Sequence, residues 1–326
     1  MKAVRIHQFG GPEVLVLEDL PIPVPGPGQV LIKVAVAGVN YSDPLHYGGQ
    51  VPPDIPVPVL PATPGFEVAG VIEQLGPEVS TPAVGMRVAA SLEDGGYAEY
   101  AQAPVPTVTP LPDDIDFATV TTLLIQGMTA YELVVKAAQV QAGERVLIAP
   151  AAGGVGSLAV HLAKIAGAQV IGLAGSQEKL DLLQSIGVDF AFDYTRPDWV
   201  QNVLQATAGQ GVNVLLDSVG GETAMQGMLC VGKLGRILFF GLASNRPMPP
   251  LNLLLLNSKE QQIVGFGGPL NHPERIHEAR QALIKYIQSK QLRPIIGQTF
   301  ALEEAATAQR ALLQRLTVGK MVLSVS

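Results

Sequence analysis

The sequence predicts an α/β protein in which a doubly wound parallel sheet follows an all-β region. Three observations support this class. From about residue 143 onward, candidate strands and helices alternate, which is typical of a parallel sheet. Between the first strand and the first helix of that region, residues 151–156 read Ala-Ala-Gly-Gly-Val-Gly. Residues 1–118 instead hold short apolar runs separated by Gly and Pro, as in strands joined by turns.

The first region also contains a candidate site. Its apolar runs predict strands at 2–6, 14–17, 29–37, 66–75 and 87–91. Residues 38–50 form a polar and aromatic loop that includes Asn40, Tyr41, His46 and Tyr47. Polar groups gathered on a loop beside a β domain often belong to a functional site.

Helical spacing first appears between residues 116 and 140, where Asp116 is a typical helix N-cap. Beyond residue 143 we expect six strands, at 145–150, 169–174, 189–193, 212–217, 235–240 and 261–266. The helices between them are expected at 154–166, 177–186, 197–207 and 221–230. The last segment predicts helices at 273–289 and 302–313 and a closing strand at 320–324.

The composition excludes several classes of function. A length of 326 residues with 48% hydrophobic and 15% charged residues allows two domains with a sizeable core. The net charge of −7, without a basic run, argues against nucleic-acid binding. The single cysteine, Cys230, excludes an intrachain disulfide and a thiolate zinc cluster. The apolar run at 251–256 is far shorter than a membrane span, so we expect a soluble, cytoplasmic protein without membrane contact.

The glycine-rich turn at 151–156 predicts a dinucleotide site. A strand, a glycine turn and a helix hold a pyrophosphate on the N–H groups of the helix N-terminus. We expect Gly153 and Gly154 to admit the phosphates, because a Cβ there would collide with them. Gly156 is expected to let the helix pack closely on the strand. Ala151 replaces the first glycine of the usual pattern, but the strand–turn–helix context supports the interpretation.

The end of the second strand of this region favours NADP(H) over NAD(H). An NAD site usually has an Asp or Glu there, which binds the ribose 2′-hydroxyl. Here the strand ends at Ala174 and is followed by Gly175, Ser176 and, three residues later, Lys179. A hydroxyl and an ammonium suit a 2′-phosphate, which an Asp would repel. Ser176 is also a plausible helix cap, and both roles are compatible.

The sequence predicts chemistry without a metal. Its five histidines are scattered, and no His/Cys cluster has the spacing of zinc ligands: His7, His46, His161, His272 and His277. We expect His46, in the polar loop, to be solvated rather than a ligand. Glu67 is a single carboxylate, which does not make a zinc site.

Together these residues resemble the medium-chain dehydrogenase/reductase superfamily, and within it the zinc-free quinone oxidoreductases of the zeta-crystallin-like branch. Phe66 stands where zinc members carry the histidine of Gly-His-Glu, and Asn40 stands where they carry a ligand cysteine. The four-cysteine zinc lobe is absent. Residues 143–156 match the family's Gly-Glu-x-Val-Leu glycine-rich signature, and residues 217–220 and 240–244 resemble its later cofactor-lining turns. The similarity covers the whole chain.

The resemblance implies a bilobal architecture with the site in the cleft. A GroES-like β domain would comprise residues 1–120 and 263–326, and a Rossmann domain would be inserted at 121–262. It also implies a homodimer in which the strand near 261–266 pairs across the interface. Relatives often carry Arg at the position of Tyr47 and Tyr at that of Val51, where enoyl-thioester reductases have their proposed proton donor. Its absence argues against that activity.

The resemblance also implies the cofactor-binding residues. Tyr194, with Gly175, Ser176 and Lys179, is similar to the family's 2′-phosphate pocket. Thr129 is expected to seat the nicotinamide. The remaining NADPH contacts expected are Ala152, Gly153, Gly154, Val155, Gly156, Ser218, Val219, Phe240, Gly241, Ala243, Ser244, Phe266, Gly267 and Lys320.

Three functions are compatible with the sequence. The first is hydride transfer from NADPH to a quinone, and the second is reduction of an α,β-unsaturated carbonyl or thioester. The third is an NADPH-binding protein with little turnover. For catalysis, Asn40 and Gln126 are expected to donate hydrogen bonds to the acceptor carbonyl or the nicotinamide amide, and Tyr41 or Tyr47 to do the same and deliver a proton. Asn40 as a turn residue, Tyr47 as a cleft wall and Thr129 as a helix contact are the structural alternatives.

Overall fold

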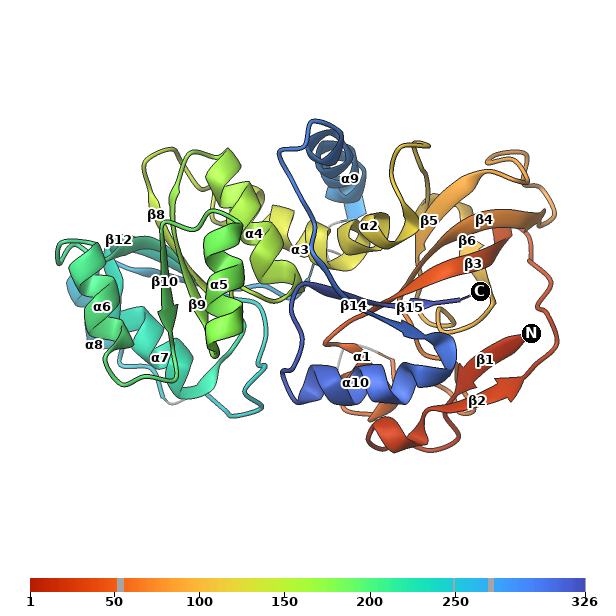
Figure 1. The fold of residues 1–326 in the computed structure, drawn as a ribbon, viewed down its shortest axis with the longest axis horizontal. Helices are drawn as coiled ribbons and strands as arrows, with labels where there is room; N and C mark the ends of the chain where they lie inside the picture. The colour runs from red at the N-terminus through yellow and green to blue at the C-terminus, as the bar shows by residue number, and fades with distance from the viewer. Residues whose placement is uncertain (52–55, 249, 269–272, 326) are drawn as a thin grey trace. The chain divides into compact units, whose positions relative to one another are not determined.

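The computed structural model describes residues 1–51, 56–248, 250–268 and 273–325. The chain divides into two compact units (Figure 1). The first unit contains Met1–Ile125 and Ile295–Ser326, and the second contains Gln126–Pro294. This division corrects the predicted boundaries, because residues 121–125 belong to the first unit and residues 263–294 to the second.

The first unit is built on a seven-stranded sheet. Its strands follow the order β14-β15-β3-β4-β5-β7, and β6 pairs with β3. The strands of this unit are β1 (Lys2–Arg5), β2 (Val16–Asp19), β3 (Gln29–Val39), β4 (Glu67–Leu75), β5 (Arg87–Ser91), β6 (Tyr100–Pro104), β7 (Val108–Pro110), β14 (Ile296–Ala301) and β15 (Lys320–Ser324). Its helices and 3₁₀ turns are η1 (Pro12–Val14), α1 (Asp43–Tyr47), η2 (Val105–Thr107), α2 (Phe117–Thr122), η6 (Leu302–Glu304) and α10 (Ala305–Leu313).

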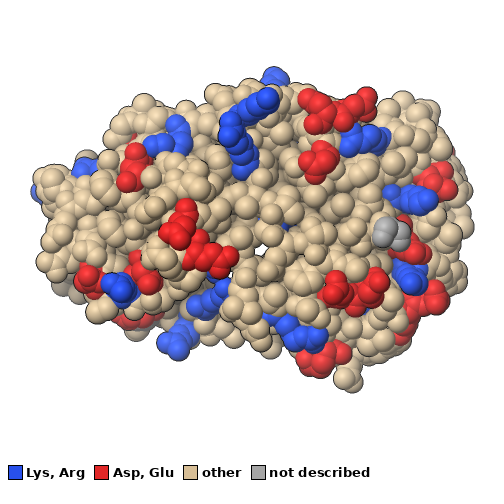
Figure 2. All heavy atoms as spheres, viewed as in Figure 1, with Lys and Arg blue, Asp and Glu red and all other residues tan. Residues whose placement is uncertain are grey.

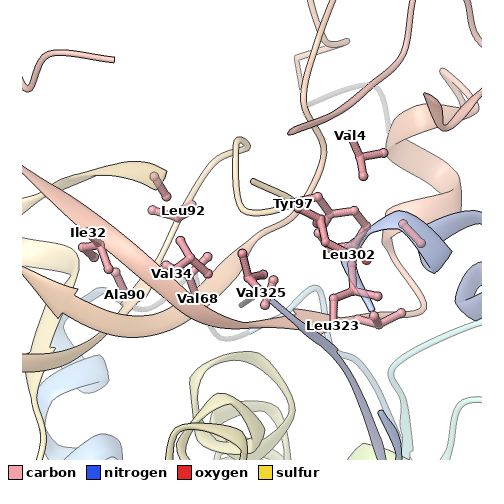
Figure 3. Close-up of a cluster of buried hydrophobic side chains, with 14 of the residues drawn as sticks. Val4, Ile32, Val34, Val68, Ala90, Leu92, Tyr97, Leu302, Leu323 and Val325 are labelled. Atoms are coloured by element: carbon pink, nitrogen blue, oxygen red, sulfur yellow. The ribbon is translucent and has the colours of Figure 1, made fainter. Parts of the chain in front are cut away.

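One apolar cluster holds the strands of the first unit together. Alternation along β3 buries Ile32 and Val34 and leaves Lys33 exposed between them, which is the period of two expected for a strand. Figure 3 shows these side chains together with members of the same cluster from β4, β5 and β15, namely Val68, Ala90 and Leu323. Burial of each aliphatic side chain contributes about 2 kcal/mol to the stability of this unit.

The second unit has a six-stranded, fully parallel sheet. Its order is β10-β9-β8-β11-β12-β13, which is the doubly wound arrangement 3-2-1-4-5-6 of a Rossmann fold. The strands are β8 (Arg145–Ala149), β9 (Gln169–Ala174), β10 (Phe190–Asp193), β11 (Val212–Asp217), β12 (Val231–Phe239) and β13 (Gln262–Gly265). The helices are α4 (Gly154–Ile165), α5 (Gln177–Ser185), α6 (Trp199–Ala206), α7 (Gly221–Leu229), α8 (Leu253–Lys259) and α9 (Pro273–Gln288).

The helix α9 explains why the second unit extends beyond the predicted boundary. It packs on α3 (Met128–Tyr131), and its Glu278 accepts hydrogen bonds from Lys136 at 2.7 Å and from Tyr131 at 3.3 Å. Arg275 forms a further ion pair with the buried Glu132 at 3.2 Å. These contacts tie residues 273–288 to the second unit.

The segment 117–137 is continuously helical and mostly buried. The α-helical turns α2 and α3 alternate with π-helical turns, η3 (Leu123–Gly127) and η4 (Glu132–Ala137). The segment is long and apolar enough to cross a membrane by those two criteria alone, with a mean hydropathy of 1.2 over its most apolar window. Because 72% of that window is buried inside the structure, its apolar residues are explained by packing within the protein.

Candidate active site

The predicted phosphate-binding turn lies between β8 and α4. Gly153 is the N-cap of α4, and a Cβ built on it meets no atom within 4 Å. The first N–H groups of an α-helix have no intrahelical acceptor and carry the positive end of the helix dipole. No protein atom therefore blocks an anionic group from this helix end. The turn fits a pyrophosphate.

The other two glycines of this turn have packing roles. A Cβ on Gly156 would overlap the Pro150 carbonyl oxygen, so the predicted close packing of helix on strand is confirmed. A Cβ on Gly154 would overlap the carboxamide of Gln126. The absence of a side chain at Gly154 thus makes room for Gln126 in this structure, and the contact of Gly154 with a phosphate stays a prediction.

The strand β9 ends without a carboxylate and is followed by polar groups, with Glu178 in the first turn of α5. Ser176 is the exposed N-cap residue of α5, but its side chain makes no capping hydrogen bond. Lys179 lies in the first turn of α5. The structure also brings Tyr194, which follows β10, over this turn, because a Cβ on Gly175 would lie 3.1 Å from the Tyr194 hydroxyl oxygen. A hydroxyl, an ammonium and a phenol near one turn fit the oxygens of a 2′-phosphate.

The turns after β11 and β12 meet at the same edge of the sheet. The N–H of Ala243 donates to the Ser218 carbonyl at 2.8 Å, and that of Ser244 donates to the Val219 carbonyl at 2.7 Å. A Cβ on Gly241 would lie 2.9 Å from the Cβ of Ser218, so the two turns are in contact. The N–H of Ser218 donates to Ala149 at the end of β8, which joins these turns to the glycine turn.

The remaining predicted cofactor residues of the second unit lie close to this edge in the chain. Phe240 directly follows β12, and Phe266 and Gly267 directly follow β13. The carboxyl ends of parallel strands are the usual binding edge of such a sheet. Thr129 is buried in α3, and the half-buried Gln126 lies in the π-helical turn η3, a feature that is frequent at functional sites.

Asp217, at the end of β11, is a titratable group that the sequence reasoning did not single out for chemistry. It is buried, and its Oδ1 accepts a hydrogen bond from the Gly220 N–H at 2.8 Å. Burial raises its pKa to about 6, although hydrogen bonds from the N–H groups of Gly220 and Val219 oppose the shift. The carboxyl therefore shapes the Asp217–Gly220 turn.

In the first unit, the predicted residue Asn40 is fixed by a buried ion pair. Its Nδ2 donates to Glu67 Oε1 at 2.8 Å, and its Oδ1 accepts from Lys320 Nζ at 2.9 Å. Lys320 Nζ also donates to Glu67 Oε1 and to the Val39 carbonyl. Glu67 and Lys320 are 0% and 1% exposed, so this pair lies in the interior of the unit. Asn40 is thus oriented by two opposite charges.

A second buried network holds the short helix α1, which occupies part of the predicted polar loop. Asp43 Oδ2 accepts from the Asn40 N–H at 2.8 Å, from the Tyr97 hydroxyl at 2.5 Å and from Gln309 Nε2 at 2.9 Å. Burial raises the pKa of Asp43 to about 6, against the opposing effects of these hydrogen bonds and of the Lys320 charge. Gln309 comes from α10, so the network connects the two ends of the chain.

Comparison with known proteins identifies the family. A family model described as alcohol dehydrogenase GroES-like domain matches residues 26–113, and one described as zinc-binding dehydrogenase matches residues 154–285. The quinone oxidoreductase of Homo sapiens is 32% identical over 326 residues, covering 99% of this chain and 97% of the human protein. That of Pseudomonas aeruginosa is 35% identical and is covered to 99% in both chains. The chain belongs to the quinone oxidoreductase family of the medium-chain dehydrogenases/reductases.

Solved structures agree with this family. The Escherichia coli quinone oxidoreductase complexed with NADPH has a TM-score of 0.91 and 27% identity, covering 99% of this chain and all of that chain. The Pseudomonas syringae quinone oxidoreductase has a TM-score of 0.90 and 32% identity, with 99% of each chain covered. A 2-haloacrylate reductase from Burkholderia is 32% identical and is covered to 98% in both chains. The predicted family, and the predicted combination of a GroES-like and a Rossmann domain, are confirmed.

At the positions where zinc members of the superfamily have ligands, this chain has other contacts. Phe66 packs against His46, with their rings edge to face at 4.9 Å between centroids. His46 is 8% exposed, so the prediction that it is solvated was wrong, and burial lowers its pKa. Among the described residues no cluster of three or more His, Cys, Asp or Glu residues has the arrangement of a metal site. His272 lies outside the described residues.

Two predicted site residues, Tyr47 and Lys320, are buried in the first unit. Tyr47 is 1% exposed, and its hydroxyl oxygen is enclosed in the first unit, where burial and the charges of Asp43 and Glu13 raise its pKa strongly. It is therefore poorly suited to deliver a proton. Lys320 donates its three ammonium N–H groups to groups of the first unit, and its contact with the cofactor stays a prediction. Tyr41, in contrast, is 39% exposed.

A hollow of about 400 Å³ lies on the first unit beside α1. Its lining residues come from three parts of the unit and are mostly small or apolar: Gly10, Gly11, Pro44, Tyr47, Gly48, Gln50 and Leu313. None of them is Asn40, Glu67 or Lys320, so this hollow is distinct from the Asn40 network.

Proposed function

We propose that this protein is a zinc-independent oxidoreductase that transfers a hydride from NADPH to a quinone. The observation that carries the choice of cofactor is the end of β9, where no Asp or Glu ends the strand, Ser176 and Lys179 follow it, and Tyr194 lies beside Gly175. The relatives support the acceptor, since those of Homo sapiens and Pseudomonas aeruginosa are named quinone oxidoreductases and the Escherichia coli quinone oxidoreductase was solved as an NADPH complex.

The residues divide the work between binding and orientation. The N-terminus of α4 at Gly153 holds the pyrophosphate, and Ser176 and Lys179 hold the 2′-phosphate. NADPH supplies the hydride when bound. Asn40 and Gln126 hold the acceptor carbonyl or the nicotinamide amide by hydrogen bonds from their side-chain N–H groups.

For the proton that accompanies the hydride, Tyr41 is the remaining candidate among the tyrosines of the 38–50 segment. Its ring is partly exposed, whereas the Tyr47 hydroxyl is enclosed and has a strongly raised pKa. A quinone accepts a hydride readily without prior protonation, so the proton at Tyr41 Oη is needed only afterwards.

The residues at the ligand positions of zinc members support zinc independence. Asn40 replaces a thiolate, and Phe66 replaces an imidazole. The Lys320 ammonium lies against both Asn40 Oδ1 and Glu67, so a divalent cation there would be repelled by an existing positive charge. We expect activity to survive dialysis against a chelator, with a zinc-dependent alcohol dehydrogenase as the sensitive control.

We further propose a homodimer in which β13 pairs with its copy. β13 is an edge strand of the six-stranded sheet, and an unpaired edge is a template for a second strand. The neighbouring helix α8 exposes Leu253 and Leu254 to 69% and 75%. Apolar side chains beside an open edge fit a self-complementary interface.

The proposed partners are a small-molecule substrate and a second copy of the chain. The proposed location is the cytoplasm, where a buried cysteine without a disulfide is usual. On the face shown in Figure 2, acidic and basic side chains are interspersed rather than gathered into a basic stripe. That distribution gives no support to nucleic-acid binding.

The test is consumption of NADPH and NADH across a panel of quinones and enones. We expect NADPH to be preferred and quinones to be reduced. Lys179→Gln should raise the KM for NADPH about 10-fold or more, because it removes a hydrogen bond to a charged group, and leave that for NADH unchanged. The exposed Lys285→Gln is the matched control. Better use of NADH by the wild-type protein would refute the cofactor, and faster reduction of enones such as 2-haloacrylate would favour the second function.

A further inference from the structure

Glu67 collects hydrogen bonds from three separate segments of the first unit. Its Oε1 accepts from Asn40 Nδ2 at the end of β3 and from Lys320 Nζ on β15. Its Oε2 accepts from the Ile125 N–H at 3.1 Å, at the end of the first unit. An ionised carboxylate without exposed surface needs such donors, because burying it uncompensated is very costly.

The ion pair fixes which way the Asn40 carboxamide points. Lys320 can only donate, so it requires the amide oxygen, and ionised Glu67 can only accept, so it requires the amide N–H. A flip of the amide would place its oxygen against the carboxylate and its NH₂ group against the ammonium. The two charges therefore define one orientation of Asn40.

The same carboxylate also holds the segment that leads to Gln126. The Ile125 N–H that binds Glu67 belongs to the residue immediately before Gln126. Space for the carboxylate comes from Gly38, because a Cβ there would overlap the Glu67 side chain. Glu67 thus contacts Asn40 and the residue that precedes Gln126. Asn40 and Gln126 are the two residues expected at the acceptor carbonyl.

We propose that Glu67 and Lys320 are positioning residues for hydride transfer, acting as a buried charge pair that orients the carboxamide of Asn40 and anchors the chain before Gln126. The proposal rests on the proposed function of those two amides. It gives a role to Lys320, whose side chain is buried in the first unit.

A purely structural ion pair would behave differently when both charges are removed. Replacing a buried pair by neutral residues of similar size is often neutral or stabilising, whereas removing one partner leaves an uncompensated charge. Glu67→Gln/Lys320→Met should therefore recover the stability that Lys320→Met alone loses. A positioning role predicts that activity is not recovered with it, because nothing then fixes the amide.

The experiment compares wild type, Lys320→Met and the double variant in three measurements. These are kcat/KM for a quinone, Kd for NADPH, and the side-chain amide signals of Asn40 in protein labelled with ¹⁵N-asparagine, assigned with Asn40→Ser. We expect about a 100-fold lower kcat/KM in both variants, as for other misplaced reacting groups. The NADPH Kd should change less than about 2-fold, since the proposed phosphate contacts lie in the second unit.

The control is Arg236→Met, which breaks a partly buried ion pair with Glu144 in the second unit. It should lower stability without a comparable loss of kcat/KM. In the wild type the two Asn40 amide protons should exchange slowly, and in both Lys320 variants they should exchange faster. A double variant with wild-type kcat/KM and unchanged Asn40 signals would overturn the proposal. If the wild type reduces no quinone or enone, the proposed function fails, while the Asn40 signals still test the positioning.

Discussion

Replacing Asp43 by Asn should change how the stability of this protein depends on pH. The carboxyl is fully buried, and all three of its hydrogen bonds come to one oxygen, Oδ2. An Asn side chain keeps an oxygen for those donors and removes the buried charge. The helix α1 should therefore stay in place, and the comparison isolates the titration of one group.

The magnitude follows from the pKa of Asp43, which burial raises from 3.8 to about 6. Between these two pH values the folded protein keeps a proton that the unfolded chain has released. Stability therefore falls as pH rises through this window and is constant with respect to this group above it. A rise of about two in the pKa corresponds to about 3 kcal/mol in the free energy of unfolding. About 2 kcal/mol of this change occurs between pH ~4.5 and pH ~7.5.

Urea unfolding at several pH values measures this effect. The free energy of unfolding of Asp43→Asn minus that of wild type should increase by about 2 kcal/mol between pH ~4.5 and pH ~7.5. Asp189→Asn is the control of opposite sign. Burial alone would raise the pKa of Asp189, but hydrogen bonds from Lys164 and the Val170 N–H outweigh it and lower the pKa. Its variant should lose stability relative to wild type as pH rises. Parallel profiles for Asp43→Asn and wild type would refute the reasoning.

Three further predictions concern the packing of each unit and the proposed dimer. Gly154→Ala should displace the Gln126 carboxamide and lower kcat/KM for the acceptor about 10-fold or more, whereas Gly153→Ala, whose Cβ meets no protein atom, should instead weaken NADPH binding measured by calorimetry. Leu323→Ala should cost about 2–5 kcal/mol in urea unfolding, because it leaves a cavity in the core of the first unit. Leu254→Glu should shift the mass measured by light scattering from dimer to monomer, and an unchanged dimer would contradict the proposed interface.

Most strands and helices of the second unit could be predicted from the sequence, because the patterns that indicate them are local. The period of each strand and helix depends on a few consecutive residues, and the predicted strands at 169–174 and 212–217 match β9 and β11 at both ends. The sequence did not indicate which element packs against the apolar face of each helix. The helix predicted at 273–289 matches α9 closely. Its packing on α3, and hence its place in the second unit, depends on contacts such as that of Glu278 with Lys136, 142 residues away.

The candidate site divides along the same line. The glycine turn and the strand-end serine were found because backbone geometry and phosphate chemistry require particular residues at short spacing. The network around Asn40 could not be found this way, because Lys320 lies 280 residues from Asn40 and 253 from Glu67. A lysine is normally expected on the protein surface. Only the antiparallel pairing of β15 with β3 places Lys320 in the interior of the first unit. The same distance hid the network around Asp43, because its partner Gln309 comes from α10, 266 residues away. Removing the charges of Glu67 and Lys320 from water costs free energy of folding. That cost is the physical reason to expect that the pair has a role, which we propose is the orientation of the Asn40 carboxamide.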